Sequence, residues 1–125
     1  MIALSATTTN DGILHIPGAS GSGAFSVATI NVGVGAAITA AAIGSGVMPT
    51  TIGICQSDPN TGLCLAPPAA SVTTTINQNG TPTFSIFATA GQTIPFQPAA
   101  NRLTVQFRDA GGALRGSTSV AVTTQ

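Results

Sequence analysis

Residues 102–123 read RLTVQFRDAGGALRGSTSVAVT, and this stretch decides the fold class. In its first half a leucine, a valine and a phenylalanine alternate with polar residues, which is the two-residue period of a β-strand with one buried face. The segment DAGGA has the composition of a turn, and after it Val120 and Val122 resume the alternation. The stretch therefore predicts an antiparallel β-hairpin that buries one of its faces.

The alternation also limits how the two strands of this hairpin pair. Phe107 has to lie opposite Leu114 or Gly116, because a shift by one residue would turn two serines towards the core. The pairing with Leu114 is preferred, since the other would set Arg108 against Arg115, and like charges directly opposite destabilise a sheet.

The rest of the chain repeats this pattern, with Gly, Pro or Asn between the apolar segments. Fifteen glycines and eight prolines, together with the lack of any long charged amphipathic segment, argue against helices. Short strands without helices indicate an all-β protein, an Ig-like antiparallel β-sandwich of seven or eight strands. The expected strands lie near residues 24–32, 37–43, 50–55, 71–77, 81–90, 102–109 and 114–124, with a shorter edge strand at 13–16.

The apolar residues on one face of these strands form the predicted core. Within a strand they are two residues apart, as the burial of one face requires. The predicted core residues are Ile38, Ile52, Ile54, Val72, Ile76, Phe84, Ile86, Leu103, Val105, Phe107, Val120 and Val122.

Charge is almost absent from the chain. Charged residues make up 5% of it, whereas an ordinary globular protein has about a quarter. A neutral chain lacks the cationic surface that binds nucleic acid or an anionic membrane, so we expect neither partner. The apolar run at residues 32–48 is rich in glycine and has no leucine, so it predicts a strand with its turns rather than a membrane helix. A net charge of zero also opposes self-association only weakly.

Cys55 and Cys64 are the only cysteines, and they enclose the turn-like segment QSDPNTGL. A zinc site needs about four ligands, and the chain adds only His15 and three scattered aspartates, so we expect no metal or cofactor. A redox-active pair would have C-x-x-C spacing beside a helix, and these two cysteines have neither that spacing nor that context. A disulfide within a hairpin fits the spacing, and it indicates an oxidising compartment outside the cytoplasm.

The segment Asp58–Gly62 has the chemistry of a turn: an aspartate that can bond back to the backbone, a proline that presets φ, and a glycine that tolerates a left-handed conformation. Two registers put both thiols on one face. If the Pro-Asn pair forms the tip, Cys55 lies directly opposite Cys64; if the loop has four residues, the cysteines are diagonal neighbours. The direct pair suits disulfide distances, and the diagonal pair lies at the edge of the allowed range.

Three segments together resemble the immunoglobulin-like modules of large secreted or surface-exposed bacterial proteins. They are CQSDPNTGLCLAPPAASVTTTI at residues 55–76, TPTFSIF at 81–87 and NRLTVQFRDAGGALRGSTSVAV at 101–122. The resemblance covers roughly residues 24–125, and its most distinctive part is the cysteine hairpin with the segment that follows it. It implies a spacer, stalk or adhesive module without catalytic residues.

The residues that could carry chemistry are few. His15 is the one histidine, its neighbour Asp11 lies in a turn sequence, and no serine nucleophile motif accompanies them, so we do not expect an enzyme. If the domain binds a ligand such as a glycan, the residues expected to contact it are Phe87, on the face of its strand opposite the core, and Phe96, in a segment bounded by prolines. Asn79 begins the triplet Asn-Gly-Thr, which matches the acceptor pattern for N-glycosylation. A plain turn explains the same residues.

Residues 1–23 are expected to form an interdomain linker or an edge or donor strand, ahead of a sandwich domain at 24–125. The expected function is a structural spacer, stalk or adhesive module of a secreted or cell-surface protein, with similar domains or copies of itself as neighbours. One alternative is a glycan- or ligand-binding tip domain. The other is a filament subunit, in which Ile2 and Leu4 of the N-terminal strand enter the sandwich edge of the next subunit.

Overall fold

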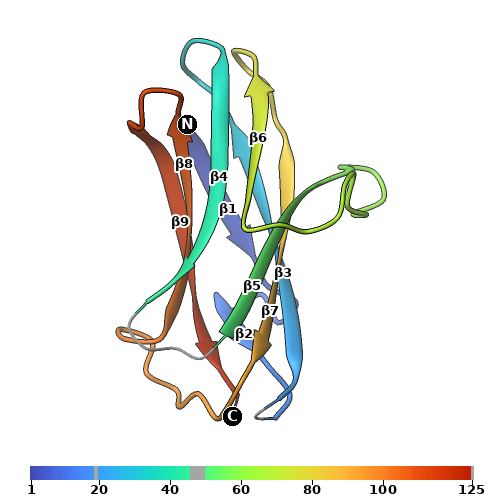
Figure 1. The fold of residues 1–125 in the computed structure, drawn as a ribbon, viewed down its shortest axis with the longest axis vertical. Helices are drawn as coiled ribbons and strands as arrows, with labels where there is room; N and C mark the ends of the chain where they lie inside the picture. The colour runs from blue at the N-terminus through green and yellow to red at the C-terminus, as the bar shows by residue number, and fades with distance from the viewer. Residues whose placement is uncertain (19, 46–49, 125) are drawn as a thin grey trace.

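The computed structural model describes residues 1–18, 20–45 and 50–124, which form two β-sheets packed face to face (Figure 1). The predicted all-β sandwich is confirmed, although the described residues form nine strands where seven or eight were expected. In this part of the chain no helix is long and apolar enough to cross a membrane. The described residues form nine strands: β1 (Ile2–Ala6), β2 (Ile13–His15), β3 (Ser22–Ile30), β4 (Ala36–Gly44), β5 (Thr50–Ser57), β6 (Ser71–Ile76), β7 (Thr83–Ala90), β8 (Arg102–Asp109) and β9 (Leu114–Thr123).

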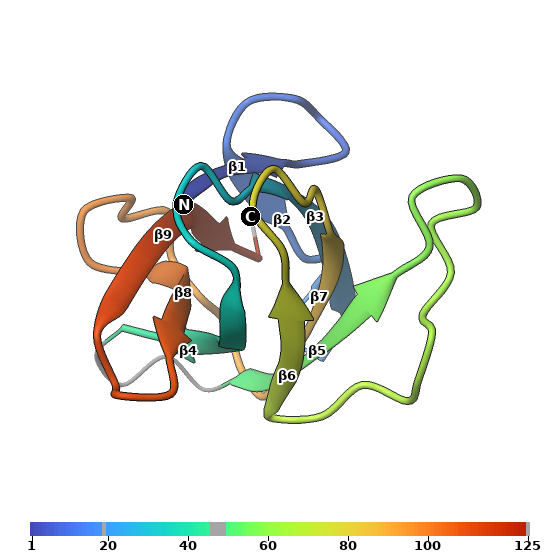
Figure 2. The same cartoon turned by 90° about the horizontal axis from the view of Figure 1, so that it is seen from above.

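The strand order is β1-β3-β7-β5 in the four-stranded sheet and β2-β9-β8-β4-β6 in the five-stranded sheet. Neighbouring strands are antiparallel except β2 and β9, which are parallel. From β4 to β7 the chain changes sheet at every connection, so β5 and β6 become the edge strands on one side of the sandwich (Figure 2). β1 and β2 are the edge strands on the other side. The segment between β5 and β6 therefore has to pass from one sheet edge to the other.

The core lies between the two sheets and follows the predicted alternation. Ten of the twelve predicted core residues are buried, and the rings of Phe84 in β7 and Phe107 in β8 meet across the sandwich with centroids 5.4 Å apart. Ile52 and Val72 are only partly buried, although both pack against the core. Each lies on an edge strand, where no further strand covers its outer side. The core also includes residues that we did not predict, namely Leu14, Ile16, Phe25, Val27, Ala40, Ala88, Ala90 and Ile94.

The final hairpin has the alternative register to the one preferred from the sequence. Phe107 lies opposite Gly116, and a β-bulge between Phe107 and Arg108 then sets Arg108 opposite Leu114. The bulge removes the repulsion that had argued against this register, because Arg115 no longer faces another arginine. Its guanidinium lies 3.7 Å from the carboxylate of Asp109 instead. The prediction that both strands turn their apolar residues to the same side is confirmed.

A buried asparagine joins two connections at one end of the sandwich. Asn31 is fully buried, and its Nδ2 donates hydrogen bonds to the carbonyl oxygens of Val34 at 3.0 Å and Ile76 at 3.1 Å. Its Oδ1 accepts a hydrogen bond from the amide of Gly33 at 3.1 Å, and its own amide donates to the carbonyl oxygen of Gly80 at 3.0 Å. The turn after β3 and the turn after β6 are therefore held together by one side chain and its backbone.

We predict that Phe84→Ala lowers the free energy of unfolding by about 3–5 kcal/mol, because it leaves a cavity where the two sheets meet. Urea-induced unfolding measures the change. Leu4→Ala is the control: this side chain is 69% exposed, so its loss should cost less than about 0.5 kcal/mol. Equal losses for the two variants would contradict this placement of the core.

Candidate functional site

The outer face of the four-stranded sheet carries small, uncharged side chains at its centre. The strand registers place Ser26 of β3 opposite Ser85 of β7, and Ser85 opposite Cys55 of β5. In the next row along these strands, Ala24 lies opposite Phe87. The side chains in the middle of this face are therefore short, and the ring of Phe87 projects further from the sheet than they do.

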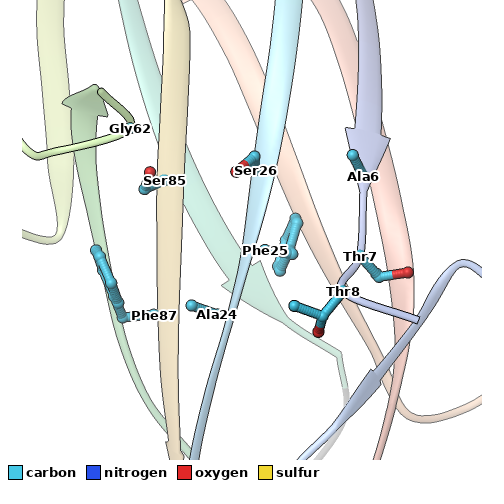
Figure 3. A pocket seen from close by; sticks show the side chains of 9 residues that line it. All are labelled: Ala6, Thr7, Thr8, Ala24, Phe25, Ser26, Gly62, Ser85 and Phe87. Atoms are coloured by element: carbon cyan, nitrogen blue, oxygen red, sulfur yellow. The ribbon is translucent and has the colours of Figure 1, made fainter. Parts of the chain in front are cut away.

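A groove of about 420 Å³ lies over these short side chains (Figure 3). One wall is the end of β1 with the turn that follows, and the other is the tip of the segment between β5 and β6. A smaller hollow of about 170 Å³, which Asp58 and Thr83 help to line, adjoins it. We call the two hollows together the outer groove. Its larger part is lined by Ala6, Thr7, Thr8, Ala24, Phe25, Ser26, Gly62, Ser85 and Phe87.

Residues 58–70 form a projecting arm between β5 and β6 (Figure 1). Its tip is the turn predicted from the sequence. The Oδ1 of Asp58 accepts a hydrogen bond from the amide of Asn60 at 2.8 Å, and the carbonyl oxygen of Asp58 accepts one from the amide of Gly62 at 2.7 Å. Gly62 has φ of 75°, the left-handed conformation for which a glycine was expected.

Cys55 and Cys64 form a disulfide, with Cα atoms 5.6 Å apart. Of the two registers left open by the sequence, the structure has the diagonal one, because Cys64 pairs with Ser57. Diagonal neighbours in a flat sheet lie about 7–8 Å apart. The stronger twist of a two-stranded ribbon accounts for the shorter separation, since it brings one of the two diagonals closer.

The arm occupies the free edge of β5. Its backbone exchanges two hydrogen bonds with that strand between Ile54 and Ala69, at 2.8 and 3.0 Å, and a third runs from the amide of Leu65 to the carbonyl oxygen of Gln56 at 2.9 Å. An uncovered edge strand is a template for pairing with another chain. The arm therefore protects this edge of the four-stranded sheet.

The arm also presents apolar side chains to solvent. Leu63 and Leu65 on either side of Cys64 are 70% and 62% exposed. They were not singled out in the sequence, although their position within a turn-rich segment was an available signal of exposure. The arm lies close to its strand at Gly53, where a Cβ would come within 3.1 Å of the Cβ of Pro68.

The structure separates the residues predicted to contact a ligand. Phe87 is 38% exposed and lines the outer groove. Phe96 is 49% exposed in the connection between β7 and β8, and it does not line the groove. Ile2 and Leu4, the predicted donor residues, are 60% and 69% exposed on β1, which pairs along its whole length with β3 of the same chain.

His15 at the end of β2 and Asp11 in the turn before it form an exposed hydrogen bond, with Nε2 and Oδ2 3.0 Å apart. The hydroxyl of Thr9 donates a hydrogen bond to Oδ1 of Asp11 at 2.6 Å, and the amide of Ile13 donates to the same oxygen at 3.0 Å. The hydrogen bond from Thr9, followed by that from His15, lowers the pKa of Asp11 to about 2. These contacts order the turn between β1 and β2. Asn79 lies in another turn, where its amide donates to the carbonyl oxygen of Asn31.

Solved structures with a similar fold are known, at low sequence identity. The chain is similar to the N-terminal domain of PorA, with 10% sequence identity and a TM-score of 0.55, over 97% of this chain and 96% of that one. The fold is immunoglobulin-like. An ASH/PapD-like domain of human CEP192 (PapD-like domain 7) also matches, with 7% identity and a TM-score of 0.42 over 97% of this chain and 82% of that one. No protein-family model and no curated protein matches the sequence.

We predict that the double substitution Cys55→Ala/Cys64→Ala lowers the free energy of unfolding by about 2–3 kcal/mol, because the short loop is no longer closed in the unfolded chain. Urea-induced unfolding measures this change. The reduced parent protein is the control, and it should lose a similar amount. Free thiols that alkylate fully in the native, unreduced protein would contradict the disulfide.

Proposed function

We propose that this chain is a non-enzymatic structural module of a secreted or cell-surface protein, placed in series with neighbouring domains. The observation that supports this most directly is the position of the two chain ends. β1 begins at one end of the long axis of the sandwich, and β9 runs to the other end (Figure 1). A module with its ends at opposite poles extends a string of domains rather than folding it back.

The separation of the ends follows from the hydrogen bonds. The terminal nitrogen of Met1 donates to the carbonyl oxygen of Arg115, near the start of β9. β9 has 10 residues and runs from this bond towards the opposite end of the sandwich. At about 3.3 Å per residue the two ends are roughly 30 Å apart along this strand. A backbone amide can donate the bond that Met1 makes, so a preceding domain would leave this arrangement intact.

The pole at which β1 begins has the character of a contact surface. Val32 and Val34 after β3 are 54% and 73% exposed, and Leu114 at the start of β9 is 51% exposed. Arg115 joins this group to the N-terminus, because its guanidinium donates to the carbonyl oxygen of Val34 at 3.3 Å while its own carbonyl oxygen accepts from Met1. Exposed apolar residues around a chain end suit packing against an adjoining domain.

The disulfide supports the proposed location outside the cytoplasm, since disulfides persist in oxidising compartments and are rare in the cytosol. The low charge is consistent with a module whose partners are other uncharged surfaces. A filament built by donation of β1 is less well supported than a series of domains. It would require β1 to leave five residue pairs with β3 and the hydrogen bond between Ser5 and Ser119 of the same chain.

An antibody raised against this domain tests the proposal on the cells from which the protein comes. We predict that it labels intact cells or their medium and detects a polypeptide much larger than the 12.2 kDa of this chain. A cytoplasmic protein, probed before and after permeabilisation, is the control for cell integrity. A free polypeptide of the size of this chain, reached only after permeabilisation, would contradict the proposal.

A further inference from the structure

We propose that the outer groove binds a neutral oligosaccharide. This site is on the face of the four-stranded sheet, not at a pole, so it is compatible with a module whose two ends adjoin other domains. The proposal goes beyond the structural role and does not depend on it. It rests on the hydroxyl groups, the aromatic ring, the lack of charge and the backbone pairing of the strands beneath the groove.

Three hydroxyl groups that line the groove have no partner within the described part of the chain and are free to bind a ligand. Ser85 is 8% exposed and lines the groove, and its hydroxyl makes no hydrogen bond to any described residue (Figure 3). Ser26 directly opposite it on β3 and Thr8 on the wall likewise have hydroxyls without a partner among the described residues. Because no buried side-chain oxygen of the described residues lacks a hydrogen-bond partner, these hydroxyls are open to the groove. A ligand that both donates and accepts can bond to them there in place of water.

Phe87 presents an aromatic ring to the groove. Its ring stands one row along the sheet from Ser85, on the same face of β7, and remains 38% exposed. The face of an aromatic ring carries partial negative charge, and it attracts the C–H groups that cover one side of a sugar ring. A sugar lying on Phe87 would bring its hydroxyl groups towards the two serines.

The charge of the groove selects a neutral ligand. None of the residues that line its larger part is charged, and Asp58 is the charged residue that lines the smaller hollow. The Oδ1 of Asp58 already accepts the amide of Asn60. An acidic sugar or a phosphate would meet no cation here, and its desolvation would go uncompensated.

The strands beneath the groove argue against a peptide. Extended peptides bind sheets mainly by adding a strand to a free edge, where backbone groups are unpaired. The groove instead lies over β3 and β7, which are paired on both sides in the order β1-β3-β7-β5. Only side chains are available there. The volume of about 420 Å³ is within the roughly 300–1,000 Å³ typical of small-molecule sites.

The test is an NMR titration of the ¹⁵N-labelled protein with lactose, cellobiose and diacetylchitobiose in the millimolar range. We expect at least one of these sugars to shift the amide resonances of Ser26, Ser85, Phe87 and Gly62 selectively. Phe87→Ala should weaken that binding about five- to tenfold, as expected for the loss of a stacked ring. Ser85→Ala should weaken it about three- to tenfold, as expected for one hydrogen bond.

Phe96→Ala is the matched control, because it removes an exposed phenylalanine outside the groove and should leave the affinity unchanged. Amide spectra of the free variants that overlay on the parent outside the substituted site show that each one folds. The proposal is overturned if none of the three sugars shifts the groove resonances, or if the Phe87 and Ser85 variants bind as tightly as the parent. It is also overturned if a neutral peptide with the sequence of residues 1–10 shifts these resonances and the sugars do not.

Discussion

The alternation of side chains along β7 is the constraint on which both the core and the groove depend. Phe84 and Ile86 point into the sandwich, where Phe84 meets Phe107 of the opposite sheet. The same geometry turns Ser85 and Phe87 to the other face, because successive residues of a strand point to opposite sides. A shift by one residue would expose the core residues and bury a serine, so packing of the core also fixes which residues line the groove.

The alternation of side chains explains the floor of the outer groove but not its wall at the arm. The disulfide helps to form that wall. Cys55 lies beside Ser85 on the outer face, and its bond to Cys64 holds the arm over the edge of β5. Natural sheets often protect an edge with lysine or other charged side chains. This chain has no lysine and few charges, and a covalently held arm protects the edge instead. The same arm carries Gly62 to the rim of the groove, so one covalent bond both covers the edge and shapes the site.

The sequence predicted those features that depend on local periodicity and turn chemistry. The inward positions of Phe107 and Val122, the disulfide and the left-handed Gly62 all follow from neighbours within a few residues. The buried Asn31 depends instead on a contact between distant segments. The bulge at Arg108 and the diagonal register of the cysteines lie within single hairpins, where two registers satisfied the alternation and the sequence pattern did not choose the one that the structure has. The groove itself was not predicted. Phe87 stood out because it lies opposite the core face, whereas the place of Ser85 at the bottom of a groove arises only when three strands and the arm assemble.

The central claim is that the disulfide holds the arm against β5, and native-state hydrogen exchange tests it most directly. The amides of Ile54, Leu65 and Ala69 make the hydrogen bonds between arm and strand. We predict that reduction of the disulfide, under conditions in which the protein stays folded, accelerates exchange at these three amides and leaves the amide of Val105 in the core strand β8 protected. Unchanged exchange at these three amides after reduction would contradict the claim, because the arm would then hold its place without the covalent bond.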